Sequence, residues 1–421
     1  MSLQGPMIVV ADSPATDLVD ALSAAGAFPI VEAKWADAPT AFVAVKPAAV
    51  VIAEPGAPHS ESSARMLCLQ IATANGSIVP VIARAYGDQE AAIPIALPAD
   101  AALPVERLIA RLQSAMRVRA LHATVLRRIE MFGSSDGRLP PFPIGDALDE
   151  ATVLIAGRGP LYPKLSVAMG ERVKMLGALS VETAAKHLNA RDIDGIVVGD
   201  GFSPRMVEAF LTVLAQDTRF RDIPVAVIGE APPEFAEVLP NIDHVDGDPA
   251  RLVARMVPLV RMHAFEARLK RMLKSLDADG MFDPETGLLT RERFWRELDQ
   301  AAAEAGDRSQ ALSIARFSFD GAPDERAGKD GARLLTRLIR TIDFACRDDD
   351  GSFLIAFTQT DLRSAHVVAR RIAGALKSAI LAPQHGRDEI AANVTLATLK
   401  AGDTLDTLLL RVMGSRMVAA E

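Results

Sequence analysis

Two groups of charged residues near the C-terminal end of the sequence have types and spacings that could do chemistry. Arg340 and Asp343 stand three residues apart in RTID, and Asp348, Asp349 and Asp350 follow in a row. An arginine and a carboxylate at that spacing can form a surface salt bridge worth less than about 0.5 kcal/mol, or they can bind a ligand. Three acids could recruit a cation, but neighbouring side chains on a hairpin point alternately and rarely converge. The pattern R-x-x-D recurs elsewhere in the chain, so its position in the fold must decide its meaning.

The elements around these residues predict a hairpin. A helix is expected over 332–342, and the apolar run FLIAF at 353 predicts a strand. Asp350-Gly351 between apolar flanks is a strong hairpin signal, because both central positions of a type I′ turn need positive φ. The acidic turn therefore has a structural reason to exist, whether or not it binds anything.

The rest of the sequence predicts a multidomain α/β protein. With 421 residues the chain is long enough for about three domains, and its 49% hydrophobic and 24% charged content is typical of globular proteins. Short apolar runs separated by single helices occur in two passes, which begin with MIVVA at 7 and TVLIAG at 152. This alternation predicts two doubly wound parallel sheets of the flavodoxin-like kind.

Composition also suggests the domain boundaries. We expect the first domain over 1–121, a Gly- and Pro-rich linker over 122–150, the second domain over 151–262, a basic connecting helix over 263–278 and a third domain over 279–421. The third domain mixes strands with long helices, so an α+β arrangement is expected there.

Charge and hydropathy exclude several classes of protein. A formal net charge of −8 argues against a nucleic-acid surface, because duplex binding needs a basic face. Only Cys68 and Cys346 are present, which is compatible with a reducing compartment and gives no metal cluster. No long apolar run or leader pattern occurs, so we expect a cytoplasmic protein without membrane insertion.

The third domain resembles the GGDEF domain of diguanylate cyclases. DPETGLLTRERF at 283 is similar to the motif that opens that domain, with Thr286, Gly287, Leu288 and Arg291 in register. The two domains ahead of it resemble receivers, as in response-regulator cyclases of receiver-receiver-GGDEF architecture. The resemblance implies a nucleotide-cyclase-like α+β fold for the third domain.

In that register the catalytic positions of the family have lost their chemistry. The Gly-Gly-Asp/Glu-Glu signature falls on Asp349, Asp350, Gly351 and Ser352. The metal-binding aspartate of the family falls on Ala315, and the Asn and Asp that read the guanine base fall on Pro323 and Ala332. The resemblance thus predicts no catalytic residue, no metal and no cofactor, because two-metal phosphoryl transfer depends on carboxylates.

A second site of the family is retained. Such cyclases are inhibited by their product, cyclic di-GMP, at an Arg-x-x-Asp motif five residues before the signature turn, and Arg340 and Asp343 stand at that distance. Arg371 matches an additional arginine of the same site. Arginine can make two hydrogen bonds to guanine O6 and N7, and a carboxylate accepts from N1 and N2 on the other edge. The expected ligand is cyclic di-GMP.

The receiver-like domains are altered in the same way. The phosphate-accepting aspartate of a receiver falls on Ala53 in the first domain, or on Glu54 if the strand is one residue longer. In the second domain it falls on Gly199, next to Asp200. Phosphorylation is therefore not expected, and both domains are predicted to be dimerisation or docking surfaces.

These observations predict a catalytically inactive receptor for cyclic di-GMP that forms a homodimer. The resemblance implies that its protein partners are an adaptor and a substrate of regulated proteolysis in cell-cycle control, with recruitment to a cell pole. Three alternatives stay open: a ligand-free docking scaffold, a GTP-binding sensor and a weak diguanylate cyclase.

Overall fold

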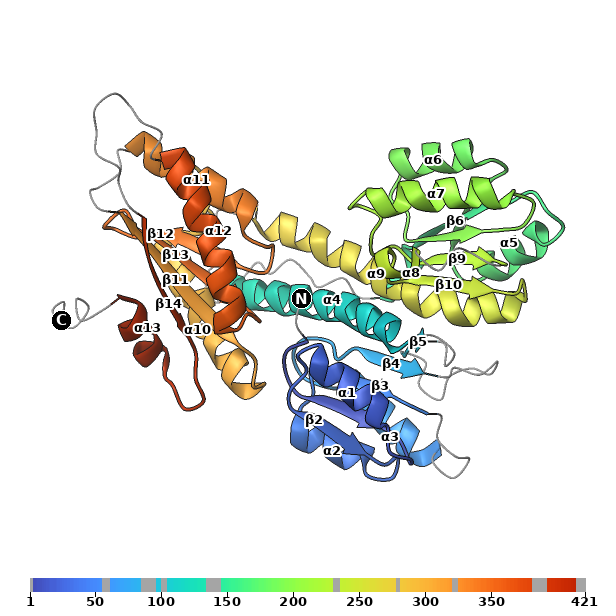
Figure 1. Ribbon diagram of the computed structural model, residues 1–421, viewed down its shortest axis with the longest axis horizontal. Helices are drawn as coiled ribbons and strands as arrows, with labels where there is room; N and C mark the ends of the chain where they lie inside the picture. The colour runs from blue at the N-terminus through green and yellow to red at the C-terminus, as the bar shows by residue number, and fades with distance from the viewer. Residues whose placement is uncertain are drawn as a thin grey trace. The chain divides into compact units, whose positions relative to one another are not determined.

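The computed structural model describes residues 3–54, 61–84, 96–99, 104–133, 145–229, 235–277, 281–319, 325–380 and 392–413. Contacts divide the chain into two compact units. The N-terminal unit comprises Met1–His122 and Pro141–Lys270, and the C-terminal unit comprises Ala123–Pro140 and Arg271–Glu421. This division differs from the predicted boundaries, because two long helices, α4 (Val105–Gly133) and α9 (Pro249–Asp277), contribute residues to both units (Figure 1).

The N-terminal unit contains two five-stranded parallel sheets. The first consists of β1 (Met7–Val10), β2 (Ile30–Ala33), β3 (Ala49–Ile52), β4 (Val81–Arg84) and β5 (Leu97–Ala99), with helices α1 (Thr16–Ala24), α2 (Ala38–Val45) and α3 (Glu61–Ala72). The second consists of β6 (Thr152–Ala156), β7 (Lys174–Ala178), β8 (Gly195–Val198), β9 (Val225–Ile228) and β10 (Ile242–Val245). Its shorter helices are η2 (Ala147–Asp149), α5 (Tyr162–Gly170), α6 (Val181–Ala190), α7 (Pro204–Gln216) and α8 (Phe235–Val238).

The strand orders of the two sheets correspond to each other. They are β2-β1-β3-β4-β5 and, read from the matching edge, β7-β6-β8-β9-β10. Both are the 2-1-3-4-5 order of doubly wound flavodoxin-like folds. The predicted pair of parallel sheets is confirmed.

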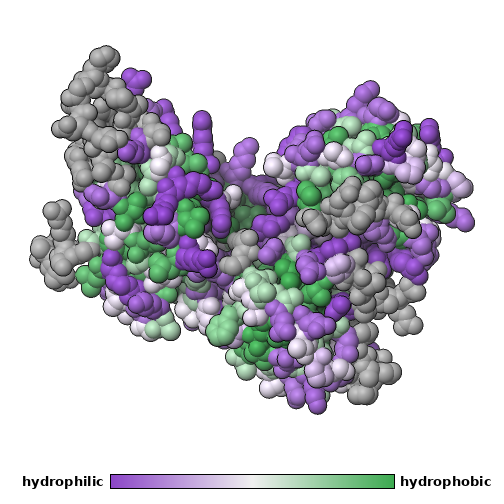
Figure 2. All heavy atoms as spheres, in the orientation of Figure 1, coloured by the Kyte–Doolittle hydropathy of each residue, from purple (hydrophilic) through white to green (hydrophobic). Residues whose placement is uncertain are grey.

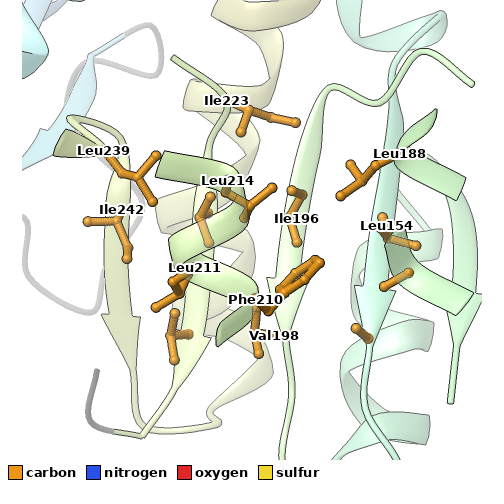
Figure 3. Packing of buried hydrophobic residues seen from close by; sticks show 14 of the residues in the cluster. Leu154, Leu188, Ile196, Val198, Phe210, Leu211, Leu214, Ile223, Leu239 and Ile242 are labelled. Atoms are coloured by element: carbon orange, nitrogen blue, oxygen red, sulfur yellow. The ribbon is translucent and has the colours of Figure 1, made fainter. Parts of the chain in front are cut away.

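Helices cover the sheets and bury their apolar strands. In the second sheet, Phe210, Leu211 and Leu214 of α7 pack onto Ile196 and Val198 of β8 (Figure 3). Strands of a parallel sheet are covered on both faces and therefore consist of nearly continuous apolar residues. That property made them recognisable in the sequence.

The C-terminal unit contains a four-stranded antiparallel sheet in the order β12-β13-β11-β14. Its strands are β11 (Leu312–Phe319), β12 (Phe344–Arg347), β13 (Phe353–Thr358) and β14 (Ala392–Thr398), and its helices are α10 (Arg291–Asp307), α11 (Glu325–Leu338), α12 (Leu362–Ile380) and α13 (Leu405–Met413). Apolar residues of α11 and α12 pack on one face of the sheet, and those of α10 and α13 pack on the other (Figure 1). Met131 of α4 belongs to the second of these cores.

The hairpin between β12 and β13 does not have the predicted type I′ turn. In this loop Gly351 has a positive φ of 84°, whereas Asp350 does not have a positive φ. The amide of Gly351 donates to Asp348 O at 3.0 Å, and the amide of Asp348 donates to Ser352 O at 2.8 Å. This is a tight turn followed by a glycine bulge, which suits a loop longer than two residues.

The linking segments also differ from their predicted limits. Helix α4 continues to Gly133, so the beginning of the predicted linker 122–150 is helical, and 134–144 lie outside the described residues. Helix α9 begins at Pro249 and includes the predicted connecting helix up to Asp277. In the part of the chain that the structure describes, no helix combines the length and the apolar character that crossing a bilayer requires.

Candidate functional site

The RTID segment forms a tight corner between α11 and β12. The amide of Asp343 donates to Arg340 O at 3.0 Å, and Thr358 Oγ1 donates to Ile342 O at 2.9 Å. The carboxylate of Asp343 accepts from the amide of Thr358 at 3.1 Å and from the amide of Arg340 at 3.4 Å. The corner is therefore fixed to the end of β13 by two hydrogen bonds, each between a side chain and the main chain.

Asp343 is buried while Arg340 is exposed. Only 5% of Asp343 is accessible to solvent, and burial raises the pKa of its carboxyl to about 7 although Arg340 and two amides favour the charged form. Arg340 is exposed. Arg340 and Asp343 thus do not form a salt bridge between side chains, so the arginine is available to a ligand, whereas the Asp343 carboxyl group already accepts from two amides.

A cavity of about 340 Å³ lies at this corner. Its walls come from the corner itself, from the loop before α10, and from the ends of α4 and α9. The lining residues are Arg128, Leu273, Asp277, Phe282, Gly287, Leu288, Leu289, Thr336, Ile339, Arg340, Thr341, Asp343, Phe344 and Ala345. Two of the three predicted ligand-binding residues, Arg340 and Asp343, therefore line one cavity.

The loop that begins with Asp283 shapes one wall of this cavity. Asp283 accepts from the amides of Glu285 at 2.8 Å and Gly287 at 2.7 Å, through its carboxylate and its carbonyl respectively. Gly287 has a φ of +69°, which favours glycine at that position. The motif that carried the family resemblance thus builds part of the cavity wall.

The third predicted residue, Arg371, lies elsewhere. It is exposed on α12 and is not among the residues that line the cavity. Figure 2 shows hydrophilic side chains over the outward face of this helix, where Arg363, Arg370 and Arg371 are exposed. The structure therefore places Arg371 in a basic helix face and does not join it to Arg340.

Two arginines form ion pairs with the acidic turn, which consists of Asp348, Asp349 and Asp350. Arg291 at the start of α10 reaches Asp348 Oδ1 at 3.0 Å and Asp349 Oδ2 at 2.5 Å. Arg316 of β11 pairs with Asp350 and donates to Ser352 Oγ at 3.3 Å. Partial burial of Asp350 acts to raise its pKa, but hydrogen bonds from Ser352 and the charge of Arg316 outweigh it and lower the pKa.

The other predicted active-site positions belong to the core. Ala315 and Ala332 are fully buried in the apolar cluster between the sheet and α11 and α12, and Pro323 lies outside the described residues. A magnesium ion of the kind used by cyclases does not fit the described residues here, because Ala315 offers a methyl group and the nearby carboxylates are already paired with guanidinium groups.

In the first sheet, the predicted phosphate-accepting positions Ala53 and Glu54 lie next to the loop that follows β1. Ala53 is partly buried, and the carboxylate of Glu54 accepts from the amides of Asp12 and Ser13, both at 2.7 Å. The Nε1 of Trp35 donates to Glu54 O at 3.3 Å. Glu54 is thus tied to the main chain that follows β1.

The second sheet repeats this arrangement with Asp200. Its carboxylate accepts from the amide of Leu161 at 3.2 Å and approaches Gly159 so closely that a Cβ there would lie 2.0 Å from Oδ2. Gly199 pairs its amide with Ala156 O at 2.6 Å. In both sheets a carboxylate after the third strand therefore holds the loop after the first.

Four residues with a part in these sites were not predicted as site residues: Arg128, Asp277, Arg291 and Arg316. Arg316 stands beside the predicted Ala315, and the alternation of side chains on a strand could have indicated that it, and not Ala315, reaches the turn. No local pattern marks Arg128 or Asp277, which are far apart in the sequence. A larger cavity, about 450 Å³, lies in the N-terminal unit and contains none of the predicted residues.

No protein-family model and no curated protein matches the chain. The chain is similar to several solved structures, which are GGDEF domains. The coiled coil and GGDEF domain of DgcB from Caulobacter crescentus in complex with c-di-GMP has 21% identity and a TM-score of 0.30, over 36% of this chain and 87% of that one. The cyclase SiaD with its activator SiaC from Pseudomonas aeruginosa has 20% identity and a TM-score of 0.31, over 36% and 64%. The GGDEF domain of FimX from Pseudomonas aeruginosa has 17% identity and a TM-score of 0.29, over 33% and 93%.

Proposed function

We propose that this protein is a receptor for cyclic di-GMP that binds the dinucleotide at Arg340 and Asp343. The observation that carries the proposal is that both residues line one cavity, with Asp343 buried and Arg340 exposed. The guanidinium can approach O6 and N7 of a guanine, and the carboxylate can accept from N1 and N2. An apolar cavity with few convergent polar groups is the usual form of a small-molecule site.

The C-terminal unit then acts as a degenerate GGDEF domain that does not synthesise its ligand. The support is the acidic turn, in which Asp348, Asp349 and Asp350 are each paired with an arginine. Carboxylates that are already paired with guanidinium groups are not free to hold the metal ions on which phosphoryl transfer depends. In its architecture and its altered signature turn the chain resembles PopA, a paralogue of the response-regulator cyclase PleD.

The resemblance also supports a role for the two parallel-sheet domains. As degenerate receivers they would recruit an adaptor and a substrate of regulated proteolysis in the cell cycle, at a cell pole, in a cytoplasmic homodimer. The carboxylates of Glu54 and Asp200 hold their loops by accepting from main-chain amides, which suits docking surfaces of fixed shape. Binding of the nucleotide would favour the state that exposes the partner surface.

Calorimetric titration of the full chain with cyclic di-GMP tests this proposal. We expect binding by the wild type and a loss of more than tenfold in affinity for Arg340→Ala, because the guanine loses both hydrogen bonds to the guanidinium. Arg337→Ala is the matched control, since Arg337 is an exposed arginine of α11 that does not line the cavity. This control should bind like the wild type.

GTP with magnesium, added to the wild type and Arg340→Ala, separates the alternatives. Synthesis of cyclic di-GMP would revive the weak-cyclase alternative and contradict the proposal. GTP binding that survives in Arg340→Ala would favour a GTP sensor. No heat with either nucleotide, together with unchanged partner recruitment, would leave the ligand-free scaffold.

A further inference from the structure

The cavity at the RTID corner contains a second arginine and aspartate. Arg128 from the end of α4 and Asp277 from the end of α9 both line it, and Arg128 Nη1 donates a short hydrogen bond to Asp277 Oδ1. The two residues are separated by 149 positions in the sequence and meet because α4 and α9 both end in the C-terminal unit. The cavity thus contains a second arginine and aspartate, which, unlike Arg340 and Asp343, are joined to each other through their side chains.

Arg128 is held in place by its surroundings. Its guanidinium lies 5.5 Å from the ring centroid of Phe282, and its Nε is 3.6 Å from Glu297 Oε2. Glu297 has no solvent exposure, and neither oxygen of its carboxyl group has a hydrogen-bond partner among the described residues. A buried carboxyl group without a donor is costly, so Glu297 favours a conformation that keeps Arg128 beside it at the cavity.

Asp277 is the accessible member of the pair. Its side chain is 32% exposed, whereas that of Arg128 is 4% exposed. A ligand entering the cavity can therefore reach a carboxylate that is already oriented by a guanidinium. At the RTID corner the carboxyl group is buried and the arginine is exposed. In the second pair the arginine is buried and the carboxylate is accessible.

We propose that Arg128 and Asp277 form the second half of the dinucleotide site and take the second guanine of cyclic di-GMP. This inference rests on the proposed function of Arg340 and Asp343. Cyclic di-GMP carries two identical bases, and each can offer O6 and N7 to an arginine and N1 and N2 to a carboxylate. Two arginine–aspartate pairs in one cavity match that repetition.

The position of the second pair has a regulatory consequence. Residues 105–122 of α4 and 249–270 of α9 belong to the N-terminal unit, while Arg128 and Asp277 lie in the C-terminal unit. A ligand that contacts both pairs fixes the ends of the two helices against the corner. Binding of the ligand therefore restricts the two helices that continue into the N-terminal unit.

Calorimetry on the full chain with two conservative variants tests the inference. Arg128→Lys keeps the charge beside Glu297 but removes the planar fork, and Asp277→Asn removes the acceptor charge. Both should weaken binding of cyclic di-GMP by more than tenfold. The control is Arg127→Lys, because Arg127 is a buried neighbour paired with Glu304 at 2.7 Å that does not line the cavity; it should change affinity by less than threefold.

A mixed guanine–adenine cyclic dinucleotide gives a readout that a structural role would not change. The wild type should discriminate against it by more than tenfold, because adenine lacks the N1 and N2 donors that a carboxylate recognises. Asp277→Asn should reduce this discrimination. Unchanged discrimination in Asp277→Asn would overturn the assignment of Asp277 to the second base.

The outcomes separate this inference from the proposed function. Wild-type affinity in Arg128→Lys, together with loss in Arg340→Ala, would overturn the second pair and leave the receptor intact. Absence of binding by the wild type would overturn both. If Arg128→Lys unfolds the protein, the double variant Arg128→Met/Glu297→Gln removes the buried charges together, and wild-type affinity in that variant would equally overturn the inference.

Discussion

Asp343 combines two properties that seldom occur in one carboxyl group, because it is buried by the protein and yet lines a cavity. Its pKa of about 7, which burial raises, means that the group changes its charge near neutral pH. A guanine that donates to the carboxylate favours the charged form and lowers the pKa in the complex. The proposed binding of cyclic di-GMP would therefore depend on pH.

The first prediction concerns the pH dependence of stability. The carboxyl of Asp343 has an ordinary pKa of 3.8 in the unfolded chain and about 7 in the folded one. Between these values the unfolded state releases the proton first, so the free energy of unfolding falls as pH rises. Asp343→Asn removes this effect, and the variant should gain roughly 2 to 3 kcal/mol relative to the wild type between pH 5 and pH 8.

Urea denaturation at both pH values measures this difference. Asp403→Asn is the control, because Arg411 and neighbouring donors hold the pKa of Asp403 below its usual value, outside this pH window. Its difference from the wild type should be the same at both pH values. A gain for Asp343→Asn that does not depend on pH would contradict the raised pKa.

At the scale of elements, the hairpin that carries the acidic turn depends on one glycine. Gly351 has a φ of 84° in the bulge that returns the chain to β13. The left-handed conformation costs an alanine about 1 to 2 kcal/mol, because its Cβ approaches the following carbonyl oxygen. The turn is therefore specified by backbone conformation as well as by the charges around it.

We predict that Gly351→Ala lowers the free energy of unfolding by about 1 to 2 kcal/mol and that Gly351→Asn lowers it less. Gly306→Ala is the matched control. A Cβ at Gly306 meets no atom within 4 Å, and the residue lies in α10, where alanine is favoured over glycine by up to about 1 kcal/mol. Equal losses at both glycines in urea denaturation would show that φ is not the cause.

The sequence predicted elements with strong local patterns and missed those determined by distant residues. The parallel strands were recognisable because they are apolar on both faces. The type I′ turn was wrong because the loop is longer than the Asp-Gly pair suggested. The pair of Arg128 and Asp277 had no local pattern at all, since the fold alone brings the ends of α4 and α9 together.

At the scale of the whole molecule, a buried ion pair joins the two sheet domains of the N-terminal unit to each other. Arg111 of α4 reaches Asp243 of β10 at 2.9 Å, and their side chains are 3% and 2% exposed. Arg111 also donates to the carbonyl oxygens of Pro98 and Ile242. The pair joins the last helix of the first sheet to the edge strand of the second.

We predict that Arg111→Met lowers the free energy of unfolding by about 3 to 5 kcal/mol, because it leaves the carboxylate of Asp243 buried without a counter-charge. Arg111→Met/Asp243→Asn should recover part of this loss. Arg219→Met is the control, because Arg219 and Asp217 form an exposed pair whose attraction is screened by solvent. Denaturant unfolding that shows equal losses for Arg111→Met and Arg219→Met would contradict the role of burial.

The last turns of α4 limit how the domains of this protein can be recombined. Met131 fills part of the core beneath α10, and Arg128 accompanies the buried Glu297. Recombination that exchanged or deleted the first domain, α4 included, would remove these side chains and leave a hole and an uncompensated acid in the C-terminal unit. The three sheets therefore cannot be shuffled as independent modules, and a viable rearrangement has to keep the end of α4 with the C-terminal unit.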